Sequence, residues 1–188
     1  MSLTKQEFTP KQKALSINLD PTIYGTFAEI GAGQETVRHF FRAGGASHTI
    51  AKAMSAYDKS FSDAIYGKEI YNRYVTQNRL RKMLRYEVSL IEERLERESY
   101  PKTKFFSYAN TVTTINFEKT FKGHGWVGVR FQLNENEEYN EIVIHVKFRE
   151  NNATLQQETI GNLGVNLIYG AFYYSDNPRR LIDSLYDD

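Results

Sequence analysis

Residues Trp126–Phe148 read WVGVRFQLNENEEYNEIVIHVKF, and this stretch decides the fold class. Apolar residues fall on every second position over 126–133 and again over 142–148, which is the period of a strand with one buried face. The acidic connection over 134–141 predicts an antiparallel hairpin. A one-residue slip would turn an apolar set out to water, so the two apolar faces must share one side. The opposite side then carries four polar side chains: Arg130, Gln132, His145 and Lys147.

Working outward, the clearest helix covers residues 78–98, where apolar residues follow the 3-and-4 spacing of one buried face. A second long helix is predicted over 153–174 and is apolar almost all round. Shorter elements are a strand over 26–30, a helix over 34–42, a strand over 105–110 and a last helix from Asn177-Pro178 to about 186. Residues 48–58 fit a strand or a helix, with the strand favoured, and 59–77 are expected to be irregular.

These elements predict an α+β (mixed α/β) fold. Its sheet is mainly antiparallel, contains the hairpin 126–133/142–148, and is packed by the helices 78–98 and 153–174. The length of 188 residues fits one domain with a single core. We expect a polar lead-in over residues 1–20 and one globular domain over 21–188.

The amino-acid composition excludes several classes of binding partner and of chemistry. The chain has 24 basic and 23 acidic residues, and this balanced net charge does not predict binding to nucleic acid. It has no cysteine, which excludes disulfides and thiolate catalysis. No signal-like or membrane-spanning apolar run occurs, so we expect no membrane partner and a cytoplasmic location. The four histidines show no metal-ligand spacing, and no metal site or cofactor is assigned.

The first candidate site is the stretch Glu29–Glu35, where a strand runs into a glycine turn and a helix start. Free backbone N–H groups and the helix dipole converge at such a point and hold phosphates or carboxylates. We take Glu29 as a candidate catalytic residue. The candidate ligand-binding residues are Gly31, Gly33, Gln34 and Glu35. The alternative is a tight turn that needs small residues, with Glu35 favourable in the first helical turn.

The second candidate is a polar stripe on the apolar helix 153–174. Its members lie on one helical face: Glu158, Asn162, Asn166, Tyr169 and Tyr173. Polar groups on a buried helix must find partners or face a cavity, so the stripe indicates either a ligand cavity or an internal hydrogen-bond network.

The third candidate is His124, which stands between two glycines and leads into the strand that carries Trp126 and Arg130. This setting exposes an imidazole for proton transfer, and the alternative is a loop histidine without a role. We take His124 as a second candidate catalytic residue, with Trp126 and Arg130 as ligand contacts.

The charges of the helix 78–98 are ordered against its dipole. Its basic residues crowd the first half and its acidic residues follow. The basic end therefore either faces an acidic partner or phosphate, or pairs with acids elsewhere in the fold.

Five runs of the sequence carry a resemblance to a family: residues 25–35, 53–58, 62–67, 124–126 and 164–173. They resemble an uncharacterised bacterial family whose members bear automatic labels such as nicotinate or nicotinamide mononucleotide adenylyltransferase, or TonB-dependent receptor. The chain is similar to the N-terminal part of these proteins. The resemblance implies a nucleotide-directed transferase, a nucleotidyltransferase linked to NAD metabolism.

Two functions follow as hypotheses. The first is an enzyme, or a part of one, that acts on a nucleotide-like or other anionic small molecule. The second is a non-catalytic module that binds its own copy or a missing C-terminal half through the charged helix 78–98 and exposed aromatic residues.

Overall fold

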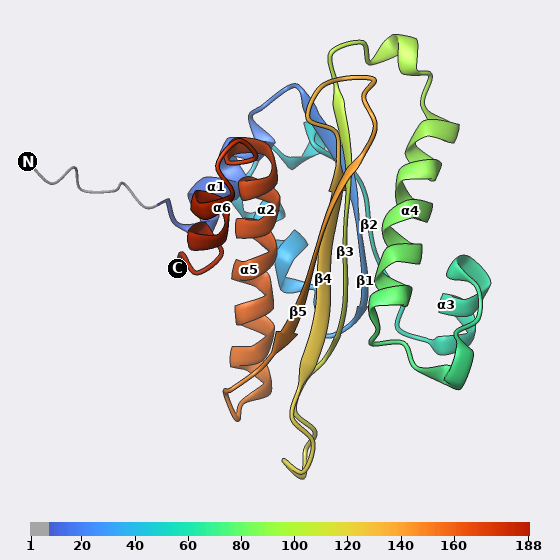
Figure 1. Ribbon diagram of the computed structural model, residues 1–188, viewed down its shortest axis with the longest axis vertical. Helices are drawn as coiled ribbons and strands as arrows, with labels where there is room; N and C mark the ends of the chain where they lie inside the picture. Colours follow the sequence, from blue (N-terminus) through green and yellow to red (C-terminus); the bar gives the residue numbers. More distant parts are fainter. Residues whose placement is uncertain (1–7) are drawn as a thin grey trace, which may run out of the picture.

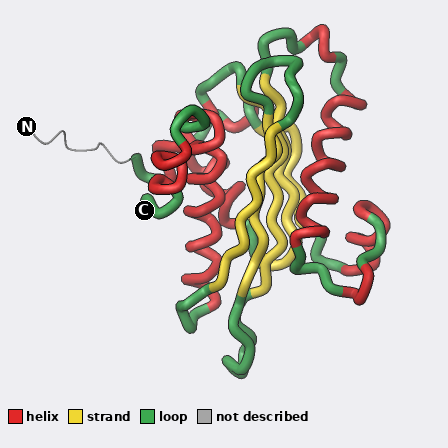
Figure 2. The backbone as a smooth tube through the Cα atoms, in the orientation of Figure 1, coloured by secondary structure: helices red, strands yellow, loops and turns green. Residues whose placement is uncertain are grey.

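The computed structural model describes residues 8–188 as a five-stranded sheet with helices on both faces (Figure 1). The strands are β1 (Ile23–Gly31), β2 (Ile50–Ser55), β3 (Lys104–Thr113), β4 (His124–Phe131) and β5 (Asn140–Lys147). The helices are α1 (Pro10–Asn18), α2 (Glu35–Ala43), α3 (Lys59–Tyr66), α4 (Gln77–Arg94), α5 (Ala153–Tyr173) and α6 (Pro178–Ser184). Figure 2 shows the strands as one layer, with α1, α2, α5 and α6 on one side and α3 and α4 on the other.

The sheet is mixed, so the expectation of a mainly antiparallel sheet was wrong. Its strand order is β2-β1-β3-β4-β5, in which β1 runs parallel to both β2 and β3, while β3–β4 and β4–β5 are antiparallel. The reason lies in the connections, because α2 lies between β1 and β2, and α3 and α4 lie between β2 and β3. Helical crossovers of this kind return the chain to the same end of the sheet.

The predicted hairpin is confirmed as β4 and β5, with Trp126 opposite His145 and Val127 opposite Ile144. The apolar sets of both strands belong to one core on the α5 side, as the register argument required. Gln132 lies just past β4 and is buried, and its side-chain oxygen accepts a hydrogen bond from the Phe105 backbone N–H at 3.0 Å.

Both predicted long helices are confirmed, although α4 ends at Arg94 instead of 98. The expectation that 59–77 is irregular was wrong for α3. Asp58 begins this helix because its carboxylate accepts the Phe61 backbone N–H at 2.8 Å. Residues 1–7 of the expected lead-in lie outside the described residues. Residues 10–18 of it form α1, which packs against α2 and α5.

Successive side chains of β1 point to opposite faces of the sheet and enter two separate hydrophobic cores. Phe27 faces α2 and α5 and packs on the rings of Phe40, Phe106 and Tyr108, with centroids 5.0 to 5.7 Å apart. Ala28 faces the other way, into a smaller cluster under α4. In the described part of the chain, no helix combines the length and the apolar character needed to cross a bilayer.

Among the glycines of α5, Gly164 is the one packed most closely against neighbouring residues. A Cβ there would overlap the Thr36 and Tyr108 hydroxyls, which hydrogen-bond each other at 2.9 Å inside the core. We expect Gly164→Ala to destabilise the fold by about 1–3 kcal/mol through overpacking. Gly170→Ala on the same helix is the control, because its Cβ meets its first neighbour, Leu181, at 3.2 Å. Urea unfolding measures both, and equal stabilities of the two variants would contradict the prediction.

Candidate functional site

The carboxyl ends of the parallel strands β1, β2 and β3 meet at one edge of the sheet, below the N-terminus of α2 (Figure 1). Ligand sites of sheets with parallel strands form at this edge. Glu29 lies here, on the central one of the three strands. It pairs with Ser55 on β2 and with Asn110 on β3, so the three residues form a row across the sheet.

The Glu29 side chain is buried, with 2% of the residue exposed. Burial raises the pKa of its carboxyl from 4.5 to about 8; the hydrogen bond from Ser55 and the nearby Val37 backbone N–H oppose this shift, and the charge of Glu35 adds to it. Glu29 is therefore largely protonated at pH 7. A carboxyl that titrates near neutrality is poised to give and take protons, which is what acid–base catalysis requires.

Two buried side-chain oxygens in this row have no hydrogen-bond partner: Glu29 Oε1 and Asn110 Oδ1. The other Glu29 oxygen accepts the Ser55 hydroxyl at 3.3 Å, and the Asn110 amide donates to the Gly33 carbonyl at 2.9 Å. Buried polar atoms are nearly always satisfied, so two orphans on neighbouring strands indicate a place for a ligand or water. Sequence reasoning missed Asn110, because only the pairing of β1 with β3 brings it beside Glu29.

The glycine turn is explained by close packing. Gly31 has a φ of +82°, and a Cβ at Gly33 would overlap the Asn110 amide. The Gln34 side chain donates to the Gly31 carbonyl and closes the turn. Glu35 begins α2 and pairs with Arg38 at 3.1 Å. The candidates of this stretch therefore lie together around the α2 N-terminus, next to Glu29.

His124 lies on the other face of the sheet from Glu29. His124 and Trp126 are two residues apart on β4, so both side chains face α4. The His124 Nδ1 atom is 3.4 Å from Nε2 of His145. Burial lowers the pKa of His124, as do the charges of His145 and Lys147. Arg130, further along β4, lies 3.5 Å from Glu141. The structure thus brings His124 and Trp126 together and keeps both apart from Glu29.

The polar stripe of α5 divides into two parts. Asn166 is buried, accepts a hydrogen bond from the buried Lys13 ammonium at 2.7 Å, and donates to the carbonyls of Leu185 and Asp187. Toward the end of the helix, the Tyr173 hydroxyl donates to Asp20 at 3.1 Å, and the Tyr169 and Tyr173 rings lie 4.6 Å apart. This part of the stripe is an internal network that ties α1 and the C-terminal segment to α5.

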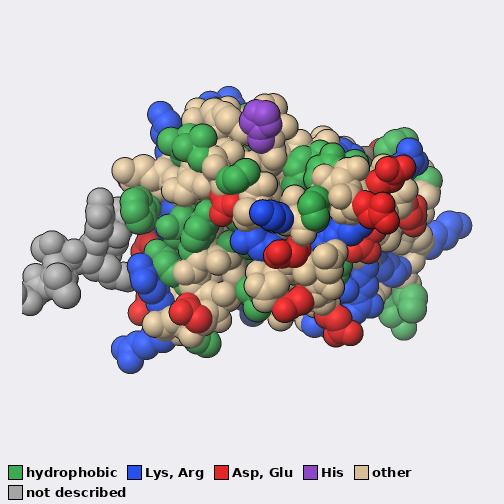
Figure 3. Space-filling model, turned by 90° about the horizontal axis from the view of Figure 1, so that it is seen from above, with side chains coloured by type: hydrophobic (Ala, Val, Ile, Leu, Met, Phe, Trp, Pro, Cys, Tyr) green, Lys and Arg blue, Asp and Glu red, His purple; other side chains and the backbone are tan. Residues whose placement is uncertain are grey.

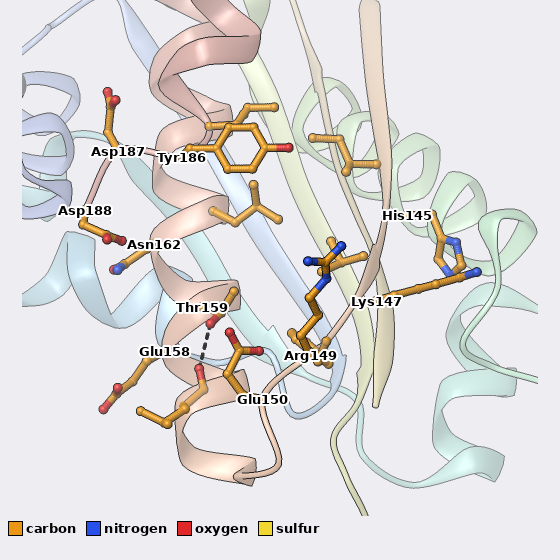
Figure 4. Close-up of a pocket in the computed structure, with 16 residues that line it drawn as sticks. His145, Lys147, Arg149, Glu150, Glu158, Thr159, Asn162, Tyr186, Asp187 and Asp188 are labelled. Atoms are coloured by element: carbon orange, nitrogen blue, oxygen red, sulfur yellow. Dashed lines mark hydrogen bonds between the residues drawn. The ribbon is translucent and has the colours of Figure 1, made fainter. Parts of the chain in front are cut away.

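The other part of the stripe, Glu158 and Asn162, lines a groove of about 890 Å³ between β5 and α5. Figure 4 shows that α5 carries these two side chains, and that Arg149 and Glu150 belong to the segment that leads from β5 to α5. The charged lining is mixed in sign: Lys147, Arg149, Glu150, Glu158, Asp187 and Asp188. Glu29, His124 and Asn166 do not line this groove.

The basic half of α4 pairs with acids of the same chain. Arg79 contacts Asp63 and Glu69, Lys82 contacts Glu69, and Arg81 contacts Glu141. The order of charges along α4 therefore follows from tertiary pairing. The face in Figure 3 likewise shows basic and acidic side chains interspersed. Over residues 8–188, no group of three or more His, Asp or Glu side chains assembles as a metal site.

Comparison with models of known families gives no match, and the curated proteins give none. Solved structures match over most of the chain. A competence-damaged protein (CinA) superfamily protein from Enterobacter cloacae has 11% identity and a TM-score of 0.62, with 89% of this chain and 94% of that chain covered. A competence or damage-inducible protein from Enterobacter asburiae has 12% identity and a TM-score of 0.62, with 87% and 98% covered. The competence/damage inducible protein CihA from Agrobacterium tumefaciens has 16% identity and a TM-score of 0.52, with 88% and 93% covered. Likeness at this identity shows a shared fold.

The resemblance to a family labelled as adenylyltransferases or TonB-dependent receptors was wrong, because the fold matches CinA-superfamily structures. The residues agree with this correction. Gly31-Ala32-Gly33 stands at the end of β1 without the histidines that an adenylyltransferase would place there to hold ATP phosphates. Nucleotidyl transfer therefore has no support as the reaction.

Proposed function

We propose that this chain is an enzyme, or a part of one, that acts on a nucleotide-like or other anionic small molecule, with Glu29 as its acid–base group. One observation carries the proposal: a buried carboxyl with a pKa near neutrality and an unpaired oxygen lies beside the unpaired Asn110 Oδ1, at the carboxyl end of parallel strands. Asn110 would orient the substrate by accepting a hydrogen bond at Oδ1. The exposed Ser55 hydroxyl would link Glu29 to solvent.

The surroundings support an anionic and aromatic ligand. With Glu29 protonated, no charge from β1 opposes an anion at the N-terminus of α2, and the Glu35 carboxylate in the first turn of this helix is paired with Arg38 at 3.1 Å. Such helix ends favour anions. The loops that follow β2 and β3 leave the same edge of the sheet and carry the exposed aromatic residues Tyr57, Phe117 and Phe121. Aromatic rings on loops are the groups on which nucleobases stack.

A thermal-shift screen tests the proposal, with nucleoside mono-, di- and triphosphates, dinucleotides and S-adenosylmethionine, each with and without Mg²⁺. A ligand at 100 times its Kd stabilises by about 2.7 kcal/mol, a shift of roughly 5–10 °C for a chain of this size. We expect Asn110→Ala to abolish the shift, whereas Glu29→Gln keeps it and removes turnover of the bound compound. Glu158→Gln, in the other groove, is the matched control. A screen without a single shift would contradict the proposal.

Self-association through β5 is the second candidate function. β5 is an edge strand of the described sheet and borders the 890 Å³ groove, and edge strands pair readily with another chain. A second copy or a C-terminal half of a longer protein would fit this role. Light scattering on the purified chain distinguishes the two functions, because a strict monomer that binds nucleotides supports the enzyme.

A further inference from the structure

We infer that His124 and His145 form a two-histidine site for a transition-metal ion, on the opposite face of the sheet from Glu29. The two imidazoles come from neighbouring antiparallel strands, at the start of β4 and near the end of β5. Nδ1 of His124 and Nε2 of His145 lie 3.4 Å apart, and their rings are inclined at 82°. The site is independent of the proposed Glu29 site, although His145 also lines the groove beside β5.

The separation of the two nitrogens, which also fits a hydrogen bond between the rings, matches that of two ligands on one metal ion. Zn–N bonds are about 2.0–2.1 Å long, and two such bonds at the tetrahedral angle place their nitrogens about 3.4 Å apart. The backbone makes the two residues neighbours, because β4 and β5 pair in a register that sets His124 diagonally across from His145. The strand pairing therefore presents both ligands without a loop having to fold around the ion.

The surroundings leave room for the remaining ligands. His145 is exposed and His124 is partly exposed, so water can complete the coordination sphere. Trp126 stacks on the His145 ring, with centroids 4.4 Å apart and planes inclined at 18°, and this contact orients the imidazole. Lys147 lies opposite His124, and its charge opposes a bound cation. Its exposed side chain can swing into water.

The donor set selects the kind of metal. Imidazole nitrogens suit Zn²⁺, Cu²⁺ and Ni²⁺, whereas Mg²⁺ and Ca²⁺ prefer oxygen ligands. With the same nitrogens, affinity should follow the order Ni²⁺ < Cu²⁺ > Zn²⁺. We expect no binding of Mg²⁺.

Trp126 is the only tryptophan of the chain, so its fluorescence reports on this site alone. The experiment titrates CuCl₂ and NiCl₂ into the metal-free chain of residues 1–188 at neutral pH and follows the quenching of this emission. Calorimetry with ZnCl₂ measures the same site without relying on fluorescence. The expected result is saturable binding with one ion per chain, and no change with MgCl₂.

Three histidine variants separate the site from other histidines, and a lysine variant tests the effect of charge. His124→Gln and His145→Gln should each weaken Cu²⁺ and Zn²⁺ binding by more than about tenfold, since the loss of a direct ligand exceeds the cost of losing a supporting contact. His48→Gln removes an exposed histidine of the short helix η1 (Ala46–His48) and should leave binding unchanged. Lys147→Gln should strengthen binding, because it removes the opposing charge.

Two results would overturn the inference. One is the absence of saturable binding to the wild-type chain. The other is binding that falls equally in all three histidine variants, or in none, which would mean that the His124–His145 contact is only a hydrogen bond between two imidazoles. Circular dichroism of each variant confirms that it is folded, and Glu29→Gln should bind the metal like the wild type.

Discussion

Arg79→Ala is expected to lower the free energy of unfolding by roughly 3–5 kcal/mol, which is the cost of breaking a buried ion pair from one side. The Arg79 side chain is fully buried in the first turn of α4. It donates to Asp63 at 2.9 Å, and its guanidinium lies 4.9 Å from the Tyr74 ring centre. Its Nε is 3.3 Å from Glu69 Oε1, close enough for an ion pair although the two are not aligned for a hydrogen bond.

The loss of stability in Arg79→Ala arises from the buried acidic side chains that the substitution leaves behind. Alanine leaves Asp63 without its cation, and Glu69, whose side chain is 4% exposed, keeps only Lys82 as a cation, at 2.9 Å. Arg85→Ala on the same helix is the matched control: Arg85 is exposed, so stability should change by less than about 0.5 kcal/mol. Urea unfolding at pH 7 measures both. A loss below about 1 kcal/mol in Arg79→Ala would mean that water replaces the guanidinium at little cost.

The same residue shows where the sequence stops being informative. Spacing along the chain predicted α4 and its apolar face, because helical periodicity is local. It could not show that Arg79 is buried, since Asp63 and Glu69 lie in a segment whose helix was itself missed. Charges ordered against the helix dipole were the available signal, and partners elsewhere in the fold were one of its two explanations.

In the sheet, too, local patterns could be predicted from the sequence, whereas contacts between distant segments could not. Alternation predicted the β4–β5 hairpin and its register, because each strand carries a period of two and the connection is short. Alternation does not specify direction, so the parallel pairing of β1 with β3 could not be predicted. That pairing puts Asn110 beside Glu29. The His124–His145 contact also depends on strand pairing, so spacing rules for metal ligands could not find it.

Glu29 offers the second large effect, and it appears as a dependence of stability on pH. Its folded-state pKa of about 8 lies above its ordinary value of 4.5, so between these values the folded chain binds more protons at this site than the unfolded chain. Its contribution is fully present below pH 4.5 and is lost as the pH rises through 8. The slope is about 1.4 kcal/mol per pH unit, and the whole loss is roughly 3–5 kcal/mol.

Glu29→Gln isolates this effect, because glutamine keeps the shape of the side chain and cannot ionise. Other groups titrate in both proteins and cancel when the wild-type free energy of unfolding is subtracted from that of the variant. This difference should increase by roughly 3–5 kcal/mol in favour of the variant between pH 5 and pH 9, and level off above pH 8. Glu158→Gln, on an exposed position of α5, should give a difference that stays within about 0.5 kcal/mol over the same range. A flat difference for Glu29→Gln would mean that the carboxyl is already ionised at pH 5. Glu29 could then not serve as a proton donor at neutral pH, and the acid–base role would have to pass to another group at this edge of the sheet.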